Sequence, residues 1–371
     1  MKQYQIGKND AGQRLDRFTA KTVPKLPDSL LQKYIRLKRI KINNKGAKRD
    51  TKLVQGDTVQ MYINDEFFYS NSEEAAYLQI SKPTLDIIYE DDNILLVNKR
   101  AGILCHSGAA ITPAKTAAAQ TPAAAPAKPP PTAAPASTPP TTATASTPPT
   151  AAAASTPTKT AAPAERDTLI SHIQAYLYQK GQWRPQEEHS FAPALCNRID
   201  RNTSGIVIAA KNAESLRIIN EKIKLREIDK YYLAAVHGTP SPPSGTLENQ
   251  IFKDSTKNVV YIKKSATPGS KTAITEYKTI KTSGQLSLLE CRLLTGRTHQ
   301  IRAQLAEIGH PLLGDGKYGS ERLNKPYGEK YQSLCSYKLA FAYKTDAGLL
   351  QYLDNKTFTI KNIPFADKYF P

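Results

Sequence analysis

The feature that most constrains the fold is a low-complexity segment in the first half of the chain. Residues 109–164 consist almost completely of Ala, Pro and Thr, and they contain no acidic and no aromatic residue. Such a composition cannot bury enough apolar surface to offset the entropy of ordering, so we expect a disordered or locally polyproline-like insert. Long insertions are tolerated because loop-closure entropy grows only logarithmically with length. The folded protein must therefore be built from the residues on either side.

The charge of the chain indicates its class of partner. The 371 residues carry a formal net charge of +18, and the sequence pI is about 9.5. Only three lysines lie within 109–164, so the positive charge belongs to the parts that fold. A balance this basic points to nucleic acid or an anionic membrane. There is no apolar run of transmembrane length and no apolar signal-peptide core at the start, so we expect no membrane partner.

The four cysteines lie far apart in the sequence, with no Cys-x-x-Cys pair and no histidines at zinc spacing. This usage predicts buried thiols in a reducing cytoplasm rather than a disulfide framework or a zinc site. The four positions are Cys105, Cys196, Cys291 and Cys335.

Residues 1–64 are predicted to form a small module of two helices and short strands. The apolar spacing indicates helices around 15–19 and from Asp28 through Leu37–Ile40, with strands at 40–42 and 58–63. Eight cations fall between residues 36 and 52, which favours a phosphate-binding patch over an ordinary solvated face. They are Arg36, Lys38, Arg39, Lys41, Lys45, Lys48, Arg49 and Lys52.

This module resembles the S4 RNA-binding domain. The resemblance is carried by residues 14–16 (RLD), 29–43 and 53–57 (LVQGD). It implies that residues 1–64 bind RNA through their basic surface.

Residues 65–80 are predicted to be a linker, and 81–371 a second domain that the 109–164 insert interrupts. Its pattern gives strands around 85–99, 206–210, 230–236, 271–280 and 286–294, with helices at 168–177 and 213–224. We therefore predict an α+β protein: a small α/β module followed by a mixed, mainly antiparallel sheet with flanking helices.

Asp200 lies in a turn that leads directly into a strand. Residues 196–205 read CNRIDRNTSG, and the apolar run IVIAA follows. Arg198 and Arg201 flank the carboxylate and would hold it ionised while offering forks for phosphate. The alternative is that Asp200 only organises its turn, as Asp often does.

A second segment, residues 294–315, contains more candidate residues. It is predicted to be a strand end, a turn at Gly296, and a helix from about Thr298 as N-cap to Gly309 as C-cap. Arg297 precedes this helix and Arg302 lies one turn further on. Taken alone, the segment is a capped amphipathic helix.

Taken together, these segments resemble the RluA-type pseudouridine synthases. The motifs are NRIDRNTSG at 197–205, KYYLA at 230–234, GRTHQIR at 296–302 and the strands of 88–99. The first motif commonly begins with His, whereas this chain has Asn197, which can still form hydrogen bonds. The resemblance covers nearly the whole chain outside 109–164.

The resemblance implies that uridine in RNA is isomerised to pseudouridine after the base is flipped into a pocket. Asp200 would act as nucleophile or base, Arg297 would pair with it, and Tyr232 would stack on the base. Core packing is the alternative for Tyr232. His299, at the start of the second segment's helix, is a weaker site candidate, and its alternative is a structural role. The reaction is redox-neutral, so we expect no cofactor and no metal. Candidate RNA contacts are Arg198, Arg201 and Arg302, together with Arg36, Lys38, Arg39, Lys41, Lys45, Lys48 and Arg49 of the first module.

An S4-like module ahead of such a domain favours large-subunit ribosomal RNA, free or in an assembling particle, over tRNA. A non-catalytic RNA-binding or ribosome-assembly factor is the main alternative. Glycoside hydrolysis is disfavoured because neither motif supplies a second carboxylate near Asp200. We expect a cytoplasmic monomer, because basic surfaces repel one another.

Overall fold

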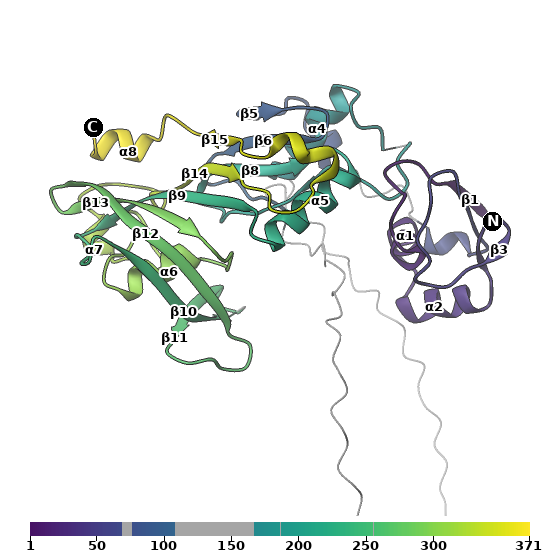
Figure 1. Ribbon diagram of the computed structural model, residues 1–371, viewed down its shortest axis with the longest axis horizontal. Coiled ribbons are helices and arrows are strands. Elements are labelled where there is room, and N and C mark those ends of the chain that lie inside the picture. The colour runs from purple at the N-terminus through teal and green to yellow at the C-terminus, as the bar shows by residue number, and fades with distance from the viewer. Residues whose placement is uncertain (69–75, 108–166, 186, 255) are drawn as a thin grey trace, which may run out of the picture. The chain divides into compact units, whose positions relative to one another are not determined.

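The computed structural model describes residues 1–68, 76–107, 167–185, 187–254 and 256–371. The Ala/Pro/Thr-rich insert predicted to be disordered lies outside these residues. Within them, the chain forms a small N-terminal module and a large sheet with helices on both faces (Figure 1).

The N-terminal module packs two helices on a four-stranded sheet. Helices α1 (Leu15–Thr22) and α2 (Asp28–Arg36) cover strands in the order β1-β4-β2-β3, and all the pairings are antiparallel. Phe18, Leu31 and Val59 are almost fully buried in its core. The strands are β1 (Lys2–Gln5), β2 (Ile40–Ile42), β3 (Lys45–Gly46) and β4 (Thr58–Met61).

The second predicted helix of this module ends earlier than its apolar pattern suggests. The prediction extended the helical face through Leu37–Ile40, but α2 ends at Arg36 and Leu37 is 55% exposed. Lys38 adopts a left-handed backbone with φ of 55°, which breaks the helix before β2 begins.

Residues 65–80, predicted to be a linker, contain two short 3-10 helices, η1 (Asp65–Phe67) and η2 (Ala76–Gln79). Phe68 belongs to the core of the N-terminal module, whereas Tyr77 packs edge-on against Trp183 of the larger body. Each end of the segment is therefore anchored by an aromatic side chain.

The larger body is built on an eleven-stranded mixed sheet. Its order is β11-β10-β12-β13-β9-β14-β8-β6-β5, with β15 beside β14 and β7 beside β8. In the described residues β14 and β8 run parallel, and the other pairs are antiparallel, which confirms the predicted mainly antiparallel sheet. The strands are β5 (Ile87–Glu90), β6 (Ile94–Lys99), β7 (Ala194–Leu195), β8 (Ser204–Ala210), β9 (Ile228–His237), β10 (Ser244–Asp254), β11 (Val259–Lys263), β12 (Lys271–Ser283), β13 (Leu286–Leu293), β14 (Leu334–Phe341) and β15 (Thr357–Thr359).

Alternate side chains of β8 enter two different cores because successive residues of a strand point to opposite faces. Val207 and Ala209 pack in the cluster that holds residues of α4 (Leu169–Gln179) and α6 (Gln300–Glu307). Ile206 and Ile208 pack in the cluster with α5 (Ala213–Lys224) and η3 (Gly348–Leu353). The remaining helices are α7 (Glu321–Asn324) and α8 (Pro364–Tyr369).

Candidate active site

The turn that carries Asp200 joins β7 to β8 and is mounted on a close strand contact. Gly205 near the start of β8 has φ of +119°, and a Cβ there would lie 2.4 Å from the backbone oxygen of Ser336 on β14. Only glycine allows the two strands to approach this closely. The contact therefore fixes the strand from which the turn projects.

Lys99, at the end of β6, forms hydrogen bonds that also stabilise this turn. Its side chain is buried, and Nζ donates to the carbonyl oxygens of Arg100, Ile103 and Arg201 at 2.8–3.0 Å. Arg201 Nε adds a bond to the carbonyl oxygen of Gly102. Burial lowers the pKa of Lys99 to about 8, although Cys105 and Asp200 act in the opposite direction. The turn is thus tied to the loop that follows β6.

Asp200 is held by an arginine that joins two carboxylates. Arg302 Nη1 donates to Asp200 Oδ2 at 3.1 Å, while its Nε and Nη2 bind Asp315 bidentately at 2.7 and 2.9 Å. Asp315 is fully buried, whereas the Asp200 side chain is 26% exposed. Burial raises the pKa of Asp315, but the hydrogen bonds and charge of Arg302 outweigh it and leave that pKa below its ordinary value.

The predicted partner of Asp200 is therefore wrong: the pairing arginine is Arg302, not Arg297. Arg297 is exposed, and its Nε donates to the backbone oxygen of Thr272 on β12. Arg302 lies on the buried face of α6 and points to the Asp200 turn. Arg302 was predicted to contact RNA; in the structure its side chain is 8% exposed, and its Nε, Nη1 and Nη2 each bond a carboxylate of the protein.

The predicted start of this helix is also corrected. Thr298 is not the N-cap; α6 begins at Gln300, and His299 precedes it in a left-handed conformation with φ of 51°. Gln300 Oε1 instead accepts bonds from the Arg297 amide and the Thr295 hydroxyl. Gly309 was predicted as the C-cap, but α6 ends at Glu307 with Ile308 as its C-cap, and Gly309, with φ of +85°, follows.

Asn197, which stands where the family motif commonly has His, forms a hydrogen bond to the backbone. Its Oδ1 accepts from the amide of Ile208 at 2.8 Å. This bond ties the start of the turn to β8.

Tyr232 on β9 lies in the core beside Ile199 and Ile301, and it is 6% exposed. Burial, with a smaller effect of the nearby Asp200, raises the pKa of its phenol well above the usual value. The two flanking arginines lie outside: Arg198 and Arg201 are both exposed. The turn thus presents cations to solvent and its carboxylate to the interior.

His299 is buried at the edge of this site. Its Nε2 lies 3.8 Å from Asp200 Oδ2, and its Nδ1 lies 2.8 Å from the hydroxyl of Tyr318. Sequence reasoning missed Tyr318, whose only signal is its place in the run that follows Asp315.

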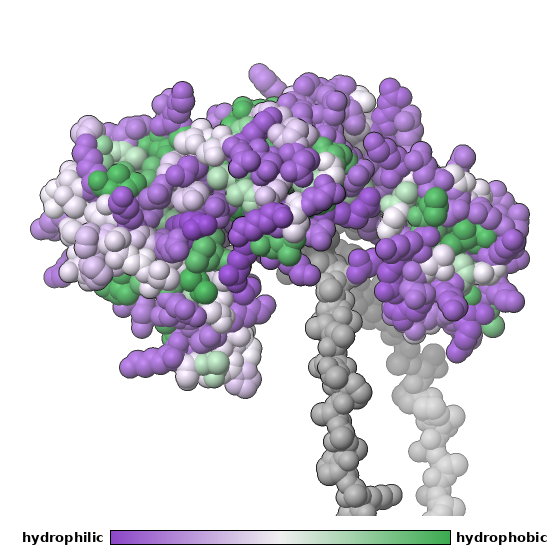
Figure 2. All heavy atoms as spheres, in the orientation of Figure 1, coloured by the Kyte–Doolittle hydropathy of each residue, from purple (hydrophilic) through white to green (hydrophobic). Residues whose placement is uncertain are grey.

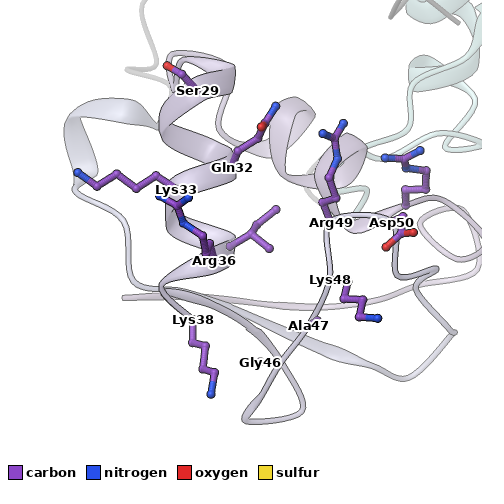
Figure 3. Close-up of a pocket in the computed structure, with 12 residues that line it drawn as sticks. Ser29, Gln32, Lys33, Arg36, Lys38, Gly46, Ala47, Lys48, Arg49 and Asp50 are labelled. Carbon is purple, nitrogen blue, oxygen red and sulfur yellow. The ribbon is translucent and has the colours of Figure 1, made fainter. Parts of the chain in front are cut away.

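A basic groove of about 870 Å³ lies in the N-terminal module (Figure 3). Four of the predicted RNA contacts line it, Arg36, Lys38, Lys48 and Arg49, and the sequence prediction omitted Arg14 and Lys33. Arg39, Lys41 and Lys45 lie outside it; the first two stack on Tyr34 and Tyr62. The remaining lining residues are Ser29, Gln32, Ile35, Gly46, Ala47 and Asp50.

The surface of this module is mainly hydrophilic in the face that Figure 2 presents. Arg14 and Arg49 are partly neutralised because both bind Asp16. For Lys33, Arg36 and Lys48 the structure gives no ion pair within the described residues, so these cations are available for anions.

All four cysteines carry free thiols; Cys105, Cys291 and Cys335 are buried, as expected, whereas Cys196 is only partly buried. Among the described residues no group of three His, Cys, Asp or Glu side chains is arranged to hold a metal ion. None of the described helices is long and apolar enough to cross a membrane.

Comparison with known proteins identifies relatives over most of the chain. The family model for RNA pseudouridylate synthase matches residues 93–307. A Mycoplasma genitalium protein named as an uncharacterized RNA pseudouridine synthase is 26% identical over 91% of this chain and 88% of its own length. The ribosomal large subunit pseudouridine synthase C of Buchnera aphidicola is 27% identical over 86% of this chain and 81% of its own length. The human RNA pseudouridylate synthase domain containing 4 structure aligns with a TM-score of 0.48 at 16% identity, covering 78% of this chain and 93% of its own.

The arrangement of the two arginines gives a direct test. Arg302→Ala leaves the buried Asp315 without its partner, and we expect it to lower the free energy of unfolding by about 3–5 kcal/mol. Arg297→Ala removes one exposed bond, and the expected loss is within about 0.5 kcal/mol. Urea denaturation of both variants measures the difference. Equal losses for the two would contradict the assignment of Arg302 as the anchor.

Proposed function

The chain belongs to the RNA pseudouridylate synthase family, and on that basis we propose that it isomerises uridine to pseudouridine in large-subunit ribosomal RNA, with Asp200 as the reacting carboxylate. The observation that carries the proposal is the partly exposed Asp200 carboxylate, which Arg302 binds in the turn that precedes β8. Curated relatives named for the ribosomal large subunit support this choice of RNA.

The chemistry asks little of the protein beyond a positioned carboxylate. The bond between N1 of uracil and C1′ of the ribose breaks, the base rotates, and C5 bonds to C1′. C5 then loses its proton and N1 gains one, so no oxidant or reductant is consumed. Asp200 acts either as a nucleophile on the sugar or as a base on a ribose proton.

The residues around Asp200 take supporting roles. The buried phenol of Tyr232 stays protonated, and its ring stacks on the base once the base enters. Arg198 and Arg201 lie exposed on either side of the carboxylate, where they contact RNA phosphates or occupy the space that the flipped base leaves. Arg297 lies too far out to pair with Asp200, and its exposed position suits an RNA contact.

We further propose that residues 1–64 are an S4-like RNA-binding domain, 65–80 a connector and 81–371 the synthase domain. The separate core of the N-terminal module and its basic groove support this division. A groove lined by cations and without an aromatic ring suits backbone phosphates rather than bases.

The free thiols are consistent with a cytoplasmic protein, and we propose that the protein acts as a monomer.

The reaction is tested by tritium release. Large-subunit rRNA transcripts with uridine tritiated at C5 should release tritium to water, because bonding of C5 to C1′ expels that hydrogen. Asp200→Asn should reduce release to the level of a protein-free control.

Bulk tRNA, labelled in the same way, serves as the comparison substrate. Release from tRNA alone would keep the enzyme and overturn the rRNA substrate. Tight binding of both RNAs without release would favour a non-catalytic RNA-binding factor.

The groove is tested by a pair of matched triple variants. Lys33→Ala, Arg36→Ala and Lys48→Ala together remove three groove cations. We expect weaker rRNA binding and a salt dependence of log Kobs that is shallower by about 2–3, since each phosphate contact contributes roughly 0.7–0.9.

The control combines Arg39→Ala, Lys41→Ala and Lys45→Ala, which remove the same charge from the same module outside the groove. Filter binding across a salt series measures both variants. If the control lowers the salt slope as much as the groove variant, then net charge and not the groove binds RNA.

A further inference from the structure

We propose that His299 and Tyr318 form a positioning pair that keeps Oδ2 of Asp200 turned inward and leaves Oδ1 as the reacting oxygen. This inference rests on the proposed function, because it assigns the atom of Asp200 that reacts. Neither His299 nor Tyr318 touches the reacting atoms in this arrangement, so both act through Asp200.

The two oxygens of Asp200 have different surroundings. Arg302 Nη1 lies 3.1 Å from Oδ2, and His299 Nε2 approaches the same oxygen to 3.8 Å. Within the described residues no hydrogen bond reaches Oδ1. Donors on one side therefore restrain rotation of the carboxylate and leave one lone-pair-bearing oxygen for the substrate.

Tyr318 sets the orientation of the imidazole. Its hydroxyl accepts a hydrogen bond from the amide of Val260 on β11 at 2.8 Å, and it lies 2.8 Å from His299 Nδ1. In the proposed arrangement the hydroxyl accepts from that amide and donates its own proton to Nδ1. This assigns the imidazole N–H to Nε2, the atom that faces Asp200.

The same tyrosine also contacts the other anchor of Asp200. Its ring lies 5.2 Å from the guanidinium carbon of Arg302, and its amide donates to Asp315 Oδ1 at 3.1 Å. Tyr318 thus joins both side chains that face Oδ2. A change in its hydroxyl group alone leaves the ring against Arg302 in place.

The backbone supports a role for His299 beyond capping a helix. It has φ of 51°, a left-handed conformation that is unfavourable for a residue other than glycine. No side-chain cap bond compensates for this at the start of α6. The left-handed turn is what directs the imidazole inward to Asp200 and Tyr318.

The charge state of His299 fits this role. Its pKa is lowered to about 4, chiefly by burial; the charges of Arg302 and Lys317 act in the same direction, and those of Asp200 and Asp315 oppose them. The ring is uncharged at neutral pH, so it can face Oδ2 with an N–H without adding a second cation. The 3.8 Å separation is about 1 Å longer than a hydrogen bond and can shorten when RNA closes the site.

The test uses the tritium-release assay on the full-length protein with rRNA. Tyr318→Phe should lower kcat by about tenfold or more with KM unchanged, since small misplacements of reacting groups cost up to a hundredfold. His299→Gln should retain more activity than His299→Ala, because a glutamine amide can present an N–H to Oδ2. Tyr318→Phe should add no further loss to His299→Ala.

Tyr369→Phe is the matched control, because its hydroxyl bonds Glu329 and the Tyr327 carbonyl instead of the site. It should keep wild-type kcat. The inference is overturned if Tyr318→Phe behaves like this control, if its loss appears in KM, or if its effect simply adds to that of His299→Ala. Wild-type protein without release from any RNA would instead defeat the proposed function itself.

Discussion

The ionic chain Asp200–Arg302–Asp315 is the interaction on which the site depends. A fully buried carboxylate, Asp315, holds the guanidinium of Arg302 with two bonds, and the third arm of that guanidinium reaches Asp200. A buried ion pair is costly to desolvate and contributes little net stability. It does, however, impose one geometry on the two side chains, because the fold is strongly destabilised when either buried charge is left without its partner. Asp315 thus fixes the orientation of Arg302 toward Asp200 without contacting the substrate itself.

The sheet brings the Asp200 turn and α6, which are distant in the sequence, together at these three ionic side chains. Gly205 lets β8 lie against β14, so the Asp200 turn projects at a defined point. α6 packs with the β10–β12 end of the same sheet and carries Arg302 toward the turn. Lys99 then ties the turn to the loop after β6. Each support is a backbone or buried contact, which leaves Asp200 itself partly open to solvent.

Periodic and capped segments could be predicted from the sequence: α5 spans Ala213–Lys224 as expected, and the mainly antiparallel sheet follows from its strands. The composition of the Asp200 turn makes it a candidate, and the resemblance of its motif to the RluA-type pseudouridine synthases is what indicates a catalytic role. The choice between Arg297 and Arg302 could not be made, because it depends on where α6 begins, and the left-handed residue His299 sets that start at Gln300. Tyr318 was equally hidden, since its contacts with His299 and Val260 are tertiary and leave no local pattern.

The most direct measurement is a structure of the protein with RNA that carries 5-fluorouridine at the target position. Fluorine at C5 cannot leave as a proton, so the isomerisation stops with the nucleotide in the site. The account predicts that the ribose of this nucleotide lies against Oδ1 of Asp200 while Arg302 still holds Oδ2. A ribose that approaches Oδ2, or a target nucleotide bound away from Asp200, would contradict it.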